Sequence, residues 1–65
     1  MVTIDNIEYQ VHFKTIGKEV AIIVQGFDFD EVRGHDGDGF TAKEHAKYCF
    51  KKQVEKAKDV EVTWG

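Results

Sequence analysis

The sequence contains no proline, no serine and no leucine, and it has one cysteine among its 65 residues. Without serine, a Ser-His-Asp catalytic arrangement is impossible. Because Cys49 is the only cysteine, no disulfide can form within the chain, as expected for a protein of the reducing cytoplasm. No Cys/His cluster has the spacing of a structural zinc site. The chain must therefore be stabilised by its own packing or by burial against another chain.

Long apolar runs are missing as well. The longest run is Val20–Val24, far short of the roughly 20 residues that a membrane span requires. Met1 leads directly into a strand-like pattern, without the basic start and apolar stretch of a signal peptide. We therefore expect a soluble cytoplasmic protein without a membrane partner. Its apolar residues, 42% of the chain, suffice for one core, so residues 1–65 should form a single small domain.

Charge is distributed unevenly along the chain. Residues 1–40 hold three basic and eight acidic side chains, a net charge of −5. Residues 41–65 hold six lysines and four acidic side chains, a net charge of +2. The overall charge of −3 therefore hides a polarised molecule with one acidic end.

The first part of the chain has the pattern of strands joined by tight turns. Apolar and polar residues alternate from Ile7 to Lys14, which is typical of a half-buried strand. Residues 2–4, ahead of an Asp5-Asn6 turn, either form a short separate strand or lead into this one. Gly17 marks the tip of a hairpin, because glycine readily takes a positive φ. The next strand should run from about Glu19 to Phe29, and its Ala21–Val24 stretch is apolar on both faces, as in a central strand.

The second part indicates a loop, a helix and a last strand. Residues 30–39 are rich in glycine and acidic residues and are expected to form a loop. Thr41 followed three residues later by Glu44 is a capping box, which predicts a helix from about Ala42 to Lys58. Alternation over residues 60–64 predicts a final strand. The order β-β-α-β, with room for one further short strand in the loop, predicts an α+β fold in which a small antiparallel sheet carries one helix on one face.

One helix can shield only one side of such a sheet, because its diameter is roughly 10 Å. If the alternation holds to the end of the second strand, Ile22 lies on one side and Ile23, Phe27 and Phe29 lie on the other. Soluble monomers rarely expose an apolar patch of this kind without using it. We therefore expect Ile23, Phe27 and Phe29 to bind another protein or a second copy of the chain. The alternative is that the 30–39 loop or the N-terminal residues cover them.

Tyr48 should project nearly opposite the apolar stripe of the helix, among Lys47, Lys51 and Lys52. A single exposed tyrosine is ordinarily plain surface. Tyrosine with cations is nevertheless the composition of binding hot spots and of platforms that stack nucleic-acid bases. The alternative function is therefore binding of RNA or single-stranded nucleic acid through Lys47, Tyr48, Lys51 and Lys52. The net negative charge and the absence of arginine from the helix count against this alternative.

The four aspartates Asp28, Asp30, Asp36 and Asp38 give the loop region its acidic character. No register matches the EF-hand pattern, since a start at Asp36 places Phe40 at the fifth position. We expect no metal site and no cofactor. Two interpretations of the aspartates remain. They belong to a solvated, turn-rich loop, or they form an acidic docking surface for a basic partner.

Residues suited to catalysis are few. Cys49 falls on the predicted apolar stripe of the helix with Ala42, Ala46, Phe50 and Val54, where a thiol acts as a small hydrophobic group. The three histidines, at positions 12, 35 and 45, fall on a strand, a loop and a helix, and their spacing does not require them to converge. We therefore predict that the protein is not an enzyme.

The segment Gly37-Asp38-Gly39-Phe40-Thr41-Ala42-Lys43-Glu44-His45-Ala46, between a hairpin and a last strand, resembles HicB-like antitoxin domains over ten of the 65 residues. That family usually continues into a further helix or a DNA-binding segment, whereas this sequence stops at Gly65. The resemblance implies a protein that binds and neutralises another protein. Taken with the charge polarity and the uncovered apolar face, it favours a small non-catalytic interaction module, of the kind encoded by phages or toxin–antitoxin cassettes, that modulates a partner protein.

Overall fold

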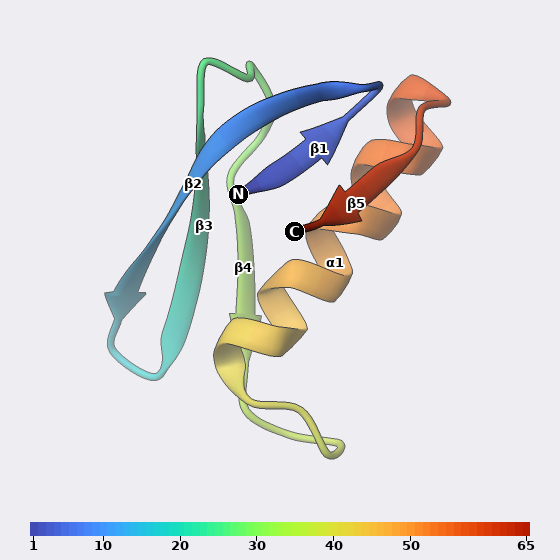
Figure 1. Ribbon diagram of the computed structural model, residues 1–65. Helices are drawn as coiled ribbons and strands as arrows, with labels where there is room; N and C mark the ends of the chain where they lie inside the picture. The colour runs from blue at the N-terminus through green and yellow to red at the C-terminus, as the bar shows by residue number, and fades with distance from the viewer.

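The computed structural model describes all 65 residues, which form five antiparallel strands in one curled sheet and a single helix (Figure 1). The strands are β1 (Val2–Ile4), β2 (Ile7–Ile16), β3 (Glu19–Gln25), β4 (Val32–His35) and β5 (Val62–Trp64), and the helix is α1 (Ala42–Lys58). The spatial order of the strands is β4-β3-β2-β1-β5. The predicted α+β fold is confirmed, and β4 is the further short strand in the loop. α1 is not long and apolar enough to cross a membrane.

Tight turns of the predicted kind connect the first three strands. Asp5 and Asn6 both adopt positive φ angles, 53° and 66°, as the centre of a two-residue hairpin requires. Gly17, with φ of 62°, turns the chain between β2 and β3. β2 is shared between two partners, because its first three residues pair with β1 and Gln10–Ile16 pair with β3. This staggered pairing lets the sheet curl around the helix.

The helix starts and stops where the sequence predicts. The Thr41 side chain accepts a hydrogen bond from the Glu44 N–H, and the Glu44 carboxylate accepts one from the Thr41 N–H, which completes the capping box. Asp59 ends the helix in the left-handed conformation, with φ of 53°. The start and end of α1 are therefore set by local side-chain chemistry.

The helix packs against the sheet side that carries Ile22. Seven buried side chains form the core cluster: Val2, Ile4, Ile22, Val32, Phe50, Val54 and Val62. Of the predicted helix stripe, Ala42, Ala46, Phe50 and Val54 are buried, whereas Cys49 is only half-buried. The helix backbone comes closest to the sheet at Gly34 of β4, where a Cβ atom would collide with the Ala46 nitrogen and the Ala42 oxygen. This contact admits only glycine.

β3 ends at Gln25, four residues earlier than predicted, because Gly26 takes a φ of 85° and turns the chain. Phe27 and Phe29 consequently leave the alternation and fold toward the helix side, where their rings lie 6.2 and 6.0 Å from that of Phe50. The prediction that Phe27 and Phe29 share the uncovered sheet face with Ile23 is therefore wrong.

The sheet face away from the helix is mostly polar. The exposed side chains of Glu8, Gln10, His12 and Lys14 lie on it along β2. Ile23, which is 45% exposed, is the one strongly exposed large apolar side chain that a strand places there. The large apolar face expected from the sequence is thus reduced to a single isoleucine.

Candidate binding sites

An open apolar pocket of about 240 Å³, called the β3 pocket below, lies beside the end of β3. β4 pairs with β3 only over Glu19–Ile22, so the last part of β3 has no neighbouring strand on that side. Eight residues line the pocket: Ile22, Ile23, Val24, Phe27, Phe29, Asp30, Glu31 and Phe50. Ile23, Phe27 and Phe29, the predicted contact residues, therefore do converge, although at a pocket rather than on one sheet face.

Packed aromatic rings form one wall of the β3 pocket. Phe27 meets Tyr9 edge to face at 5.4 Å between ring centroids, and Phe29 lies 6.0 Å from Phe27. Phe50 of α1 holds both rings against the core. Such contacts fix ring positions beyond what burial alone does. The wall is therefore expected to be preformed.

Acidic groups stand beside this wall. Glu31 is engaged by Arg33, whose guanidinium lies 3.0 Å from its carboxylate, and this hydrogen bond and the charge of Glu31 raise the pKa of Arg33. Asp28 and Asp30 are exposed and form no ion pair. Of the two, only Asp30 lines the pocket, and the Lys58 ammonium lies 5.8 and 6.0 Å from the Phe27 and Phe29 ring centroids on the same wall.

The four loop aspartates do not form one surface. The four residues of β4, about 13 Å of extended chain, lie between Asp28 and Asp30 on one side and Asp36 and Asp38 on the other. Asp36 accepts a hydrogen bond of 2.6 Å from the Ala42 N–H and so helps to hold the start of α1, while Asp38 sits in a turn with φ of 51°. No group of three or more His, Cys, Asp or Glu side chains is arranged to hold a metal ion.

The structure divides the four predicted helix-face residues. Tyr48 is 47% exposed and stacks on Phe40 at 5.7 Å, and the Lys52 ammonium lies 5.3 Å from its ring centroid. Lys47 turns instead toward Trp64, and Lys51 is engaged within the protein. Tyr48 and Lys52 therefore form one surface, and Lys47 and Lys51 do not belong to it.

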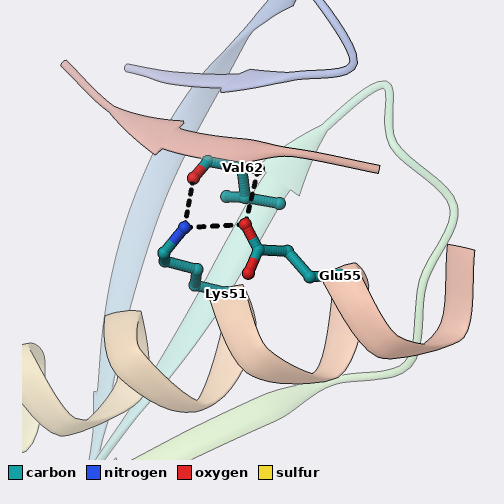
Figure 2. Close-up of polar contacts among 3 residues, drawn as sticks. All are labelled: Lys51, Glu55 and Val62. Atoms are coloured by element: carbon teal, nitrogen blue, oxygen red, sulfur yellow. Dashed lines mark hydrogen bonds and ion pairs between the residues drawn. The ribbon is translucent and has the colours of Figure 1, made fainter. Parts of the chain in front are cut away.

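Lys51 and Glu55 close the outer edge of β5, as Figure 2 shows. The Lys51 ammonium donates to the Glu55 carboxylate over 2.7 Å and to the Val62 carbonyl over 2.8 Å. The same carboxylate oxygen accepts the Val62 N–H over 3.0 Å. The Lys51 hydrogen bond, followed by that from Val62, holds the pKa of Glu55 below its ordinary value. Two side chains thus satisfy the backbone groups that a neighbouring strand would otherwise pair.

A second pocket of about 180 Å³, called the lysine pocket below, lies where β2, β5 and α1 meet. Its lining includes Phe13, Lys43, Lys47 and Trp64. Sequence reasoning missed Phe13 and Trp64 as site residues. The spacing of Lys43 and Lys47, four residues apart on one helix face, was a usable signal, but no local pattern links Phe13 to Trp64.

Two histidines and the cysteine come together beside α1, which sequence reasoning also missed. The rings of His35 and His45 lie 4.6 Å apart, and the His35 N–H donates to Nδ1 of His45 over 3.1 Å. Nε2 of the same ring lies 3.5 Å from the Cys49 sulfur. Nε2 and the thiol are therefore close enough for a hydrogen bond, whose direction follows the proton on Nε2.

No family model, no curated protein and no solved structure matches this chain. The similarity of residues 37–46 to HicB-like antitoxin domains stays an interpretation of ten residues.

Proposed function

We propose that the protein is a non-catalytic interaction module that binds a partner protein at the β3 pocket. A large apolar side chain of the partner fills the pocket, and a neighbouring basic side chain meets Asp30. The observation that carries this proposal is the convergence of Ile23, Phe27 and Phe29 on one open pocket that the unpaired Asp30 also lines.

The size of the pocket supports a side-chain ligand. At about 240 Å³ it is smaller than the roughly 300–1,000 Å³ typical of small-molecule and cofactor sites. Interfaces draw most of their affinity from a few anchors seated in such pockets. Free charges beside the anchor mainly raise the association rate and the selectivity for oppositely charged partners. A basic protein segment with one apolar anchor therefore fits both features.

Two further observations support a non-catalytic, cytoplasmic module. No carboxylate contacts the His45 ring beside the Cys49 thiol, so the pair lacks the acidic third member of a nucleophilic triad. A single free cysteine is expected in a reducing compartment. Binding and occupying another protein is also the mode of action of the phage- or antitoxin-type proteins proposed from the sequence.

The proposal is tested by selecting random peptides displayed on phage against the whole protein. The selected peptides should carry Lys or Arg next to a large apolar residue. Asp30→Lys should weaken the binding of a selected peptide about tenfold, a loss of about 1.4 kcal/mol. Glu61→Lys changes the charge equally at an exposed residue that does not line the β3 pocket and should leave the affinity unchanged.

Ile23→Lys provides the second variant, because this exposed side chain can change without disturbing the core. Selected peptides that lack basic residues, or that still bind after both Asp30→Lys and Ile23→Lys, would contradict the proposal. A concentration-dependent dimer in sedimentation that Ile23→Lys abolishes would replace the separate partner with a second copy of the chain.

A further inference from the structure

The lysine pocket brings two aromatic rings and two ammonium groups together from three elements. The Lys43 ammonium lies 4.6 Å from the ring centroid of Phe13, and the Lys47 ammonium lies 5.1 Å from that of Trp64. Phe13 belongs to β2 and Trp64 to β5, and both are half-buried. Since an ammonium can occupy these positions, each ring turns a face toward the pocket.

Neither lysine forms an ion pair; the pKa of Glu44 is lowered chiefly by its hydrogen bonds from Thr41 and only then by the charge of Lys47. The ion pairs of the protein involve Arg33 and Lys51 only. Glu44, one turn from Lys47, is directed to the backbone N–H and hydroxyl of Thr41 in the capping box. Two like charges four residues apart on a helix destabilise it by a few tenths of a kcal/mol. A bound anion between Lys43 and Lys47 would remove that repulsion.

The lysine pocket also differs in charge from the other two pockets of the protein. Asp30 and Glu31 line the β3 pocket, and Asp5 and Glu61 line a polar pocket beside β1 and β5. No acidic side chain lines the lysine pocket. In a protein with a net charge of −3, Lys43 and Lys47 are a local concentration of positive charge beside two half-buried aromatic rings.

We propose that the lysine pocket binds one nucleotide, with the base stacked on Trp64 or Phe13 and the phosphate held by Lys43 and Lys47. Stacking on aromatic rings beside cations that contact the backbone is the general mode of single-strand recognition. At about 180 Å³ the pocket is smaller than a complete small-molecule site, so it takes the base, and the phosphate lies at the rim that Lys43 and Lys47 form. The site is separate from the β3 pocket and does not depend on the function proposed there.

Trp64 is the only tryptophan, so its fluorescence reports directly on this pocket. The whole protein is titrated with oligothymidylate, with the mononucleotide UMP and with inorganic phosphate. The two nucleotide probes should quench Trp64, and inorganic phosphate should not. One neutralised phosphate on a single strand predicts that affinity falls about 2.6-fold between about 50 and about 200 mM salt. Tighter binding of the oligonucleotide than of UMP identifies single-stranded nucleic acid as the ligand, and equal binding identifies free nucleotides.

The double variant Lys43→Gln/Lys47→Gln should weaken oligothymidylate binding roughly fivefold and remove most of its salt dependence. Lys14→Gln/Lys18→Gln removes the same charge at two exposed residues outside α1 and should change the affinity less than about twofold. Both variants must keep the circular dichroism spectrum of the parent. Three results would each overturn the proposal: no quenching by either nucleotide probe, an equal loss in both double variants, or binding of polyglutamate in place of oligothymidylate with the same dependence on Lys43 and Lys47.

Discussion

The two edge strands of the sheet, β4 and β5, are both fastened to α1, but by opposite means. At β4 the contact is one of shape, since Gly34 lets the helix backbone at Ala42 and Ala46 approach without an intervening side chain. At β5 the contact is polar, since Lys51 and Glu55 hydrogen-bond the outward backbone groups of Val62 (Figure 2). Unpaired strand edges invite association with other chains. Because the sheet is curled, one helix contacts both of its edge strands and so protects both edges.

The two candidate sites lie next to these contacts between α1 and the edge strands, where the surface is not covered. The β3 pocket begins where β4 stops pairing with β3, and the lysine pocket lies between α1 and the sheet at Trp64. One site is apolar with an unpaired aspartate, and the other is aromatic with unpaired lysines. The uneven charge along the sequence thus corresponds to two separate surfaces.

Gly34→Ala should have the largest effect on stability, because the added methyl group meets helix backbone that cannot move aside independently. We expect a loss of about 3 kcal/mol or more, which lowers the melting temperature by at least about 12 °C. The loss should not depend on pH, since no ionisable group is involved. Urea denaturation followed by circular dichroism measures it.

Gly17→Ala is the matched control for Gly34→Ala. Gly17 has a positive φ but open space around it, so alanine there should cost only the conformational penalty of about 1 kcal/mol. Equal losses for the two variants would contradict the close approach of α1 to β4.

Glu55→Gln should have a smaller effect that depends on pH. The pKa of Glu55 is lower in the folded protein than in the unfolded chain, chiefly through the hydrogen bond from Lys51. The stabilisation by the carboxylate is therefore complete above the unfolded pKa of about 4.3 and is lost as pH falls through the lower folded value. The wild type should exceed the variant in stability at neutral pH and approach it in acid. Thermal melts across this range measure the difference, with Glu61→Gln as the exposed control, and a difference that stays constant into acid would rule out the polar fastening.

Thr41→Ala should have the smallest effect of the three, a loss of about 1 kcal/mol from the missing N-cap hydroxyl. The change affects the start of α1 on the β4 side and leaves the Lys51–Glu55 contact intact, so it separates helix capping from the fastening at β5. Thr41→Ser keeps the hydroxyl and should restore most of the stability in the same thermal melts. If serine is no better than alanine, the capping box does not stabilise the helix.

Local chemistry made much of the fold predictable. The capping box of Thr41 and Glu44 set the start of α1, and the Asp5-Asn6 and Gly17 turns set the hairpins. The last strand begins at Val62 and not at residue 60 as predicted, and the turn at Gly26 was overlooked. The positive φ of Gly26 ends β3 and redirects Phe27 and Phe29, which the alternation alone could not reveal.

The sites themselves depended on contacts between distant parts of the chain. Tyr48 was correctly expected to be exposed, because helical periodicity is local. Lys51 contacts Val62, and Lys47 contacts Trp64, because the curl of the sheet brings β5 next to α1. No residue pattern in the sequence specifies that curl. Lys47, Tyr48, Lys51 and Lys52 therefore looked like one surface in the sequence and proved to be divided.

A nuclear magnetic resonance titration with both ligands in one sample tests the central claim of two independent sites most directly. The ¹⁵N-labelled protein receives a selected basic peptide and oligothymidylate, singly and then together. The account predicts that the peptide shifts amides around Ile23 and Phe29, that the oligonucleotide shifts those around Lys43 and Trp64, and that both bind at once with unchanged affinities. Competition between the two ligands, or a common set of shifted amides, would contradict it.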